Sequence, residues 1–120
     1  NAYEKLFNEY VKENQISIPI VSKKLKINNH AFFVIFDNIK NKEDFIKILK
    51  ENSVFAYIGY MPLHSSPMGK SFGYKPENLK ITEDLSSRLV RLPMFCDLSN
   101  SKKLNYCTSV IKNALSKIYS

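Results

Sequence analysis

An unbroken apolar run from Ala31 to Phe36 sets the tightest limit on how this chain can fold. The run combines β-branched and aromatic residues over the length of one strand, which predicts a strand buried on both faces. It is the longest apolar run in the chain, yet far below the roughly 18 residues that a membrane-spanning helix needs. We therefore expect an interior strand and no membrane partner.

Apolar residues at helical spacing lie on both sides of this run. They predict a first helix over residues 3–14 and a second that begins at a cap at Asn41. A third helix is predicted from a cap at Thr82 to a point before Pro93, and a fourth from a cap at Ser99 to Ile118. The segments between them predict a strand at Val54–Tyr60, an extended connection at Ile16–Ile20, a further strand at Lys23–Ile27 and the longest loop at residues 64–78. This order indicates an α/β (α+β) fold, a small two-layer domain whose helices cover a few-stranded sheet.

Composition bounds the class of protein. Apolar residues make up 44% of the 120 residues, which is typical of one globular domain. The net charge of +7 comes almost wholly from lysines scattered through every segment, so we interpret them as solvating exposed helix faces. The alternative is a polyanion-binding patch, but a nucleic-acid-binding module needs basic and aromatic residues on one face. The aromatic residues here fall mainly in expected core segments, so no nucleic-acid partner is predicted.

The cysteines and the chain ends carry less information. Cys96 and Cys107 fit neither redox nor zinc spacing, so both are expected to be small buried apolar groups in a reducing cytoplasm. The two histidines lack clear carboxylate partners, and no metal site is predicted. Asn1–Ala2 is interpreted as a remnant of an expression vector, which leaves residues 3–120 as the domain.

Two motifs point to function. One is Gly59-Tyr60-Met61-Pro62-Leu63-His64-Ser65-Ser66-Pro67-Met68-Gly69, and the other runs from Thr82 through Ser86-Ser87-Arg88-Leu89 to Phe95. In this order they resemble the C-terminal part of the pyridoxal-phosphate-dependent sugar aminotransferases of the DegT/DnrJ/EryC1/StrS type. The resemblance covers residues 3–118 and is strongest to the dTDP-4-keto-6-deoxyhexose (dTDP-4-amino-4,6-dideoxygalactose) transaminases.

The resemblance implies the C-terminal small domain of a fold-type I aminotransferase. Such enzymes move an amino group, usually from L-glutamate, to the C4 ketone of a nucleotide-linked sugar for cell-envelope glycan synthesis. They act as homodimers, and their cofactor lysine lies on a large N-terminal domain that is absent from this sequence. The chain alone is therefore expected to be inactive, with apolar surface at residues 61–72 and 92–95 where a neighbour once packed. The alternative is a non-catalytic module that binds nucleotide sugars or polyanions.

His64 is the first candidate for substrate binding. It opens a loop after a strand, where an imidazole could bond a sugar hydroxyl or phosphate, or could instead hydrogen-bond its own loop. The resemblance favours the substrate role. Tyr60 could wall the pocket or pack at the edge of the core. Relatives often carry histidine where this chain has Gly59, and that difference leaves the sugar specificity open.

Three further residues match the family pattern. Asn28 and His30 form its Asn-x-His element before the first strand, and either could reach the substrate or simply satisfy a turn and a strand end. Arg88 belongs to the Ser-x-Arg-Leu signature, for which we expect mainly a structural role, with contact to a substrate phosphate as the alternative. Gly69-Lys70-Ser71 resembles the end of a P-loop, but the earlier glycine is missing, so this interpretation is rejected.

Overall fold

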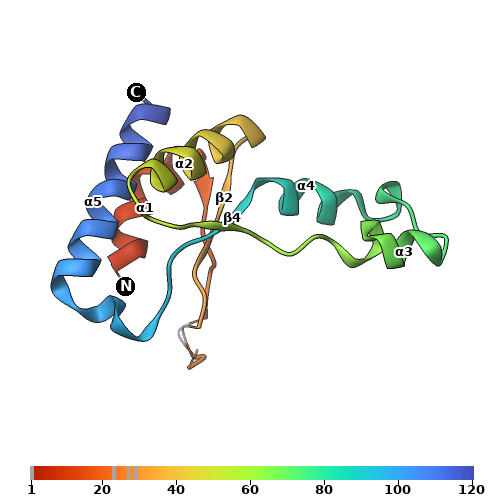
Figure 1. Cartoon of the computed structure of the whole chain (residues 1–120), viewed down its shortest axis with the longest axis horizontal. Coiled ribbons are helices and arrows are strands. Elements are labelled where there is room, and N and C mark those ends of the chain that lie inside the picture. The colour runs from red at the N-terminus through yellow and green to blue at the C-terminus, as the bar shows by residue number, and fades with distance from the viewer. Residues whose placement is uncertain (1, 23, 27, 29) are drawn as a thin grey trace.

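The computed structural model describes residues 2–22, 24–26, 28 and 30–120, which form a two-layer α+β domain with one long projection (Figure 1). The α-helices are α1 (Ala2–Lys12), α2 (Ile39–Glu51), α3 (Pro67–Ser71), α4 (Lys80–Arg88) and α5 (Ser101–Ile118). The strands are β1 (Ile16–Ser17), β2 (Phe33–Phe36), β3 (Tyr57–Ile58) and β4 (Leu89–Arg91). Short 3₁₀ helices are η1 (Leu63–Ser65), η2 (Pro76–Leu79) and η3 (Cys96–Ser99).

The strands form one antiparallel sheet in the order β1-β2-β4-β3. Val90 of β4 lies opposite Val34 of β2 on one side and Ile58 of β3 on the other. Val34 and Val90 are fully buried, because α1, α2 and α5 lie against their face of the sheet (Figure 1). The predicted fold class is thus confirmed.

The core lies between this sheet face and the three helices. The helices α1, α2 and α5 contribute five of its largest fully buried side chains, Phe7, Phe45, Leu49, Ile111 and Leu115. Burying each of these groups stabilises the fold by roughly 1.5–3 kcal/mol. These buried positions are among the apolar residues whose spacing predicted the helices.

The run at residues 31–36 is a strand, but only one face is fully buried. Val34 and Phe36 are buried completely, whereas Phe33 and Ile35 on the opposite face are half-buried. Burial on both faces was therefore a wrong expectation. The second face is left open, and Arg91 of β4, directly opposite Phe33, shares it.

The strand expected at Val54–Tyr60 is much shorter than predicted. Only Tyr57–Ile58 pairs with β4, while Val54 and Ala56 are buried in an irregular segment before it. In contrast, β4 itself falls where the sequence predicted the end of a helix. It lies between β2 and β3, and this pairing on both sides offsets its short length.

Three predicted helix caps were wrong by one to three residues. The α2 cap is Asn38, whose Oδ1 accepts the Asn41 N–H at 2.8 Å, so Asn41 sits inside the helix. The α5 cap is Asn100 rather than Ser99, and α4 already begins at Lys80. Asn41 and Ser99 are polar residues close to the true caps and satisfy the same sequence rule, whereas α4 begins after Leu79, which makes no side-chain cap bond.

The remaining local predictions have mixed outcomes. The extended connection expected at Ile16–Ile20 begins with β1. A strand was expected at Lys23–Ile27, but residues 24–26 do not form one, and the two end residues lie outside the described part of the chain. Cys107 is buried as expected, but Cys96 is exposed. No helix among the described residues is long and apolar enough to cross a membrane.

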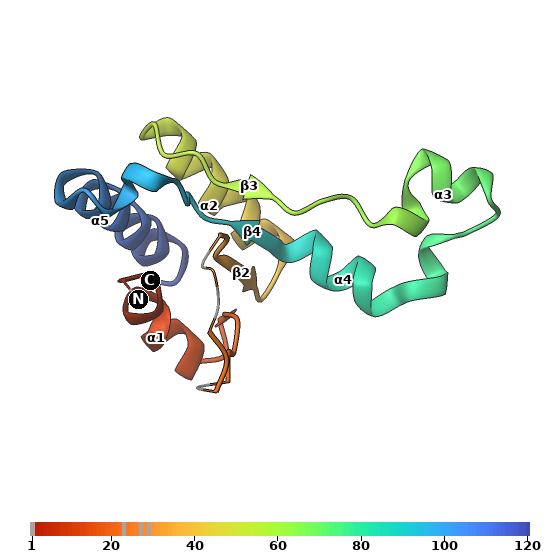
Figure 2. The same cartoon turned by 90° about the horizontal axis from the view of Figure 1, so that it is seen from below.

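Residues 59–88 form a projection, here called the arm, that leads from β3 out to α3 and returns through α4 (Figure 2). The loop expected at residues 64–78 is therefore mostly helical. The arm stretches the molecule to 48 × 35 × 28 Å and raises its radius of gyration to 15.7 Å. A compact domain of this length would have a radius of about 13–14 Å.

The tip of the arm is held by close backbone packing. The Ser66 hydroxyl caps α3 by accepting the Gly69 N–H at 3.1 Å and donates to the Leu63 carbonyl. A Cβ on Gly69 would lie 2.2 Å from the Leu63 carbonyl oxygen, so only glycine fits there.

Candidate functional site

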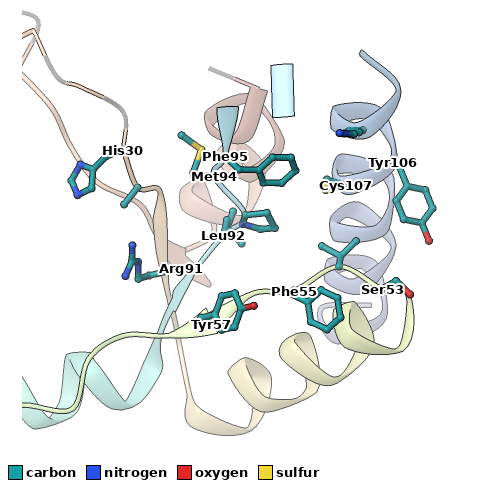
Figure 3. Close-up of a pocket in the computed structure, with 14 residues that line it drawn as sticks. His30, Ser53, Phe55, Tyr57, Arg91, Leu92, Met94, Phe95, Tyr106 and Cys107 are labelled. Carbon is teal, nitrogen blue, oxygen red and sulfur yellow. The ribbon is translucent and has the colours of Figure 1, made fainter. Parts of the chain in front are cut away.

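A hollow of about 600 Å³ lies between residues 53–57, residues 91–95 and the first turns of α5 (Figure 3). Its lining includes four aromatic rings, of Phe55, Tyr57, Phe95 and Tyr106, which are all about half-exposed. Arg91 stands at one end beside His30, and Tyr106 and Ser53 stand at the other (Figure 3). This size and lining suit a small organic ligand with a planar ring.

The strand register explains why Arg91 faces this hollow. Arg91 lies directly opposite Phe33 of β2 and Tyr57 of β3, so the three side chains share the half-open face of the sheet. A second hollow of about 380 Å³ lies on the other side of Arg91 and is lined by His30, Tyr60 and Leu89 among others. The structure thus brings His30 and Tyr60 together around an arginine.

Two groups in the hollow, Tyr106 and Lys103, are held by local contacts. The Tyr106 hydroxyl donates to the Asn52 carbonyl at 3.0 Å, which fixes the ring on the hollow's rim. Burial raises the pKa of the Cys107 thiol, so it stays protonated at neutral pH and contributes apolar lining. Lys103 pairs with Asp97 at 3.3 Å and lies over the Phe95 ring.

The Asn-x-His element is exposed and bonded to itself. His30 Nδ1 lies 2.8 Å from Asn28 Oδ1, and the same oxygen accepts the His30 N–H at 3.3 Å. Asn28 therefore orients the imidazole, and His30 is the member of the pair that lines both hollows. Asn28 lines neither of them.

Tyr60 is highly exposed. Its side chain is 87% exposed at the base of the arm, and its ring lies 5.7 Å from the Arg91 guanidinium carbon. This cation–π contact is worth roughly 0.5–1 kcal/mol at an exposed site. Tyr60 is therefore not a core-edge residue in this structure.

His64 lies far along the arm and is buried there, with 9% of its surface exposed. Its Nε2 is 2.9 Å from Glu83 Oε1 of α4, which makes an ion pair when the imidazole is protonated. The geometry falls short of a hydrogen bond, and neither atom has another hydrogen-bond partner among the described residues. His64 also borders an apolar hollow of about 800 Å³ at the arm's tip, away from His30 and Tyr60.

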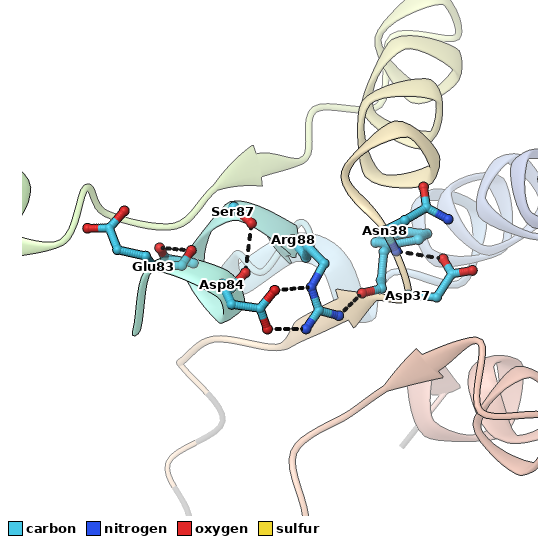
Figure 4. Close-up of polar contacts among 8 residues, drawn as sticks. Asp37, Asn38, Glu83, Asp84, Ser87 and Arg88 are labelled. Carbon is cyan, nitrogen blue, oxygen red and sulfur yellow. Dashed lines mark hydrogen bonds and ion pairs between the residues drawn. The ribbon is translucent and has the colours of Figure 1, made fainter. Parts of the chain in front are cut away.

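Arg88 joins the arm to the body of the domain (Figure 4). Its guanidinium makes two bonds to the Asp84 carboxylate one turn earlier in α4 and donates to the Phe36 carbonyl at the end of β2. The hydrogen bond from Arg88 holds the pKa of the Asp84 carboxyl below its usual range. This is the arrangement of a structural clamp.

Sequence reasoning missed Arg91, because its helix prediction ran on past residue 88. The available signal was the alternation in Leu89-Val90-Arg91, where a buried valine stands between two half-buried neighbours. Read as a strand, this alternation would have placed Arg91 on the face opposite the core.

The described residues do not make a site for pyridoxal phosphate. That cofactor needs a lysine in a pocket to hold its ring and a cradle for its phosphate. Nearly all described lysines are exposed, and Lys103, which borders the 600 Å³ hollow, is paired with Asp97. In addition, the described His, Cys, Asp and Glu residues do not gather in groups that could hold a metal ion.

Comparison with known proteins identifies relatives across nearly the whole chain. The profile of the DegT/DnrJ/EryC1/StrS aminotransferase family matches residues 1–111. The uncharacterized protein MJ1066 of Methanocaldococcus jannaschii is 26% identical over 121 residues, which cover 97% of this chain and 30% of that protein. The chain thus spans about a third of the length of this curated relative.

Solved structures show the same fold. Spr1654 of Streptococcus pneumoniae, a candidate sugar aminotransferase in its PMP form, superimposes with a TM-score of 0.80 at 16% identity, covering 98% of this chain and 29% of its own. A DegT DnrJ EryC1 StrS aminotransferase from Brucella abortus gives a TM-score of 0.67 at 21% identity, covering 93% of this chain and 30% of its own. At such identities the likeness shows the fold alone.

Proposed function

The chain belongs to the DegT/DnrJ/EryC1/StrS aminotransferase family, and we propose that it is the C-terminal domain of a nucleotide-sugar aminotransferase. The proposed reaction moves an amino group from L-glutamate to the C4 ketone of a dTDP-4-keto-6-deoxyhexose. The observation that carries this proposal is the hollow at Arg91. It offers aromatic and cationic groups next to His30 and Tyr60, two of the residues that match the family's substrate-binding pattern.

Pyridoxal phosphate would be held by a large N-terminal domain outside this sequence. When bound there, the cofactor supplies the electron sink for transamination. The residues of this chain would line the sugar-nucleotide end of the pocket. Tyr60 and His30 would border the substrate, and Asn28 would orient the His30 ring. The enzyme would act as a cytoplasmic homodimer, which is compatible with the free thiols of Cys96 and Cys107.

The contacts of His64 favour a role other than substrate binding, and those of Arg88 favour the structural role expected from the sequence. Both side chains are engaged inside the protein, His64 with Glu83 and Arg88 with Phe36 and Asp84. We infer that they order the arm, so that the residues at its base keep their positions. A substrate contact by either residue would first require breaking these interactions.

The exposed apolar surface of the arm supports contact with a further domain or chain. Leu63 is 86% exposed and Phe72 is 72% exposed, and Met61, Met68, Tyr74 and Ile81 are also more than half exposed. Such contiguous exposure marks a contact surface. The expectation of apolar exposure at residues 61–72 is confirmed, while at 92–95 Phe95 is exposed and Leu92 is buried. We assign the arm's surface to the large domain.

The test compares the 120-residue chain with the same chain joined in frame to its upstream coding sequence. Each protein is mixed with pyridoxal phosphate, L-glutamate and dTDP-4-keto-6-deoxyglucose, and the amino sugar is measured by mass spectrometry. We expect product only from the joined protein, and no saturable binding of the cofactor to the chain alone. Stoichiometric cofactor binding by the chain, or a joined protein that binds cofactor without transferring the amino group, would contradict the proposal.

A further inference from the structure

The segment between β1 and β2 exposes aliphatic side chains beyond the end of the core. Ile16 is buried and Ile18 packs against the core, but Ile20, the next residue but one, is 99% exposed. Val21 and Leu25 are 39% and 66% exposed. Single apolar residues scattered over a protein surface are normal, whereas three exposed ones within the six positions 20–25 form a group that indicates a contact.

A turn keeps these side chains together. The Leu25 N–H donates to the Ser22 carbonyl at 2.9 Å, and the Lys24 N–H donates to the Ser22 hydroxyl at 3.3 Å. The first of these bonds is that of a reverse turn, which brings the chain on its two sides close together. The segment projects past the end of the sheet, toward the bottom of Figure 1. The residues here called the tip are Ile20, Val21, Lys24, Leu25 and Lys26.

The sequence around the tip is positively charged and free of carboxylates. Residues 14–36 include no aspartate or glutamate, and three lysines fall within the four positions 23–26. Lys24 and Lys26 are exposed on either side of the exposed Leu25. The net charge of +7 adds a long-range attraction for negatively charged surfaces. The tip therefore fits a partner that is anionic and also accepts aliphatic side chains.

The residue types at the tip select among anionic partners. Protein interfaces are enriched in arginine and aromatic residues and depleted in lysine, and proteins that bind single-stranded nucleic acid stack the bases on aromatic rings. The tip contains neither arginine nor an aromatic residue. An anionic lipid surface uses both kinds of side chain that are present, because aliphatic groups enter the interface and lysines are attracted to the lipid headgroups.

We propose that the tip is a contact site for an anionic membrane surface. Ile20, Val21 and Leu25 enter the headgroup region, and Lys24 and Lys26 bind the lipid phosphates. The expectation of no membrane partner rested on the lack of a spanning segment, which such a surface contact does not need. None of the tip residues lines a hollow beside Arg91, and the site does not rest on the proposed function.

Co-sedimentation of the chain with lipid vesicles tests the charge of the tip. Vesicles of phosphatidylglycerol and phosphatidylcholine should bind the chain, and vesicles of phosphatidylcholine alone should bind it much more weakly. Lys24→Gln combined with Lys26→Gln should weaken binding about 25-fold, since each lysine near an anionic membrane contributes roughly fivefold. Lys112→Gln combined with Lys117→Gln on the exposed face of α5 removes the same charge and should change binding little. No binding to the anionic vesicles, or an equal loss in the two double variants, would overturn the assignment.

A second pair of variants tests whether aliphatic side chains enter the lipid. Ile20→Ser combined with Leu25→Ser should weaken binding to the anionic vesicles at least about tenfold, with an unchanged circular dichroism spectrum because both side chains are exposed. Leu63→Ser combined with Phe72→Ser removes exposed apolar groups from the arm and should leave vesicle binding unchanged. Vesicle binding that the arm variant abolishes, or duplex DNA that binds as tightly as the vesicles regardless of Ile20 and Leu25, would overturn the lipid contact.

The same measurements on the joined protein test whether the tip is accessible in the longer chain. Binding to anionic vesicles should persist there and should again fall with the Ile20→Ser and Leu25→Ser pair. A joined protein that leaves the anionic vesicles in solution would refute the membrane contact, whether or not it transfers the amino group. Tip-dependent vesicle binding by a joined protein without amino transfer would refute the proposed function alone.

Discussion

Replacing Arg88 by alanine should loosen the connection between the arm and the body. The guanidinium is 21% exposed and donates to the Phe36 carbonyl, so its loss removes a charged hydrogen bond and leaves that carbonyl without this donor. Hydrogen bonds to charged groups contribute about 1.5–3 kcal/mol, and we expect a loss of this size in the free energy of unfolding. In urea, with a slope on the order of 1.5 kcal/mol/M, the unfolding midpoint should fall by about 1–2 M.

The partner substitution Asp84→Asn is the matched control for this change. Its side chain is 59% exposed, so its pair with Arg88 is screened by solvent and the midpoint should move little. Because Arg88 holds the pKa of the Asp84 carboxyl below its ordinary value, this small contribution is present above the ordinary carboxyl range and is lost as pH falls through the lowered pKa. Equal destabilisation by the two substitutions would refute the clamp at Phe36 and shift the stabilisation to the exposed ion pair.

Three further predictions follow from the arm and the hollow. The chain alone should self-associate at high concentration, and the double substitution of Leu63 and Phe72 by serine should reduce this association in analytical ultracentrifugation. Unchanged association would place the self-associating surface elsewhere. At pH 8, iodoacetamide should modify the exposed Cys96 much faster than the buried Cys107. Burial raises the pKa of the Cys107 thiol, so a smaller fraction of it is the reactive thiolate. Equal modification rates, measured by mass spectrometry, would contradict the buried placement of Cys107. Gly69→Ala should disorder the arm's tip while the body stays folded, seen as faster amide exchange confined to the arm.

Much of the body could be predicted because its signals are local. The helices at the two ends of the chain repeat apolar residues at helical spacing, and positions such as Phe7 and Leu115 are indeed buried in the core. The strand at β2 followed from its composition. In these segments the pattern along the chain and the burial in space carry the same information.

The arm and the central strand could not be predicted in the same way. β4 is a short strand because β2 and β3 pair with it on both sides, and these partners are distant in sequence. The glycine and proline residues of the arm indicate a loop by composition. The structure nevertheless builds α3 there, because the Ser66 side chain caps a helix that packs on the η1 backbone.

The two arginines show why this error matters for the site. On one continuous helix, Arg88 and Arg91 would be three residues apart and would lie on the same side, so a single role would suit both. Instead the helix ends at Arg88 and a strand begins at Leu89. Side chains three residues apart share a face on a helix, whereas successive side chains of a strand point to opposite faces of the sheet. Arg88 therefore returns to the Phe36 carbonyl, while Arg91 faces the half-open side of the sheet. The functional difference between two identical side chains is set by one boundary between a helix and a strand.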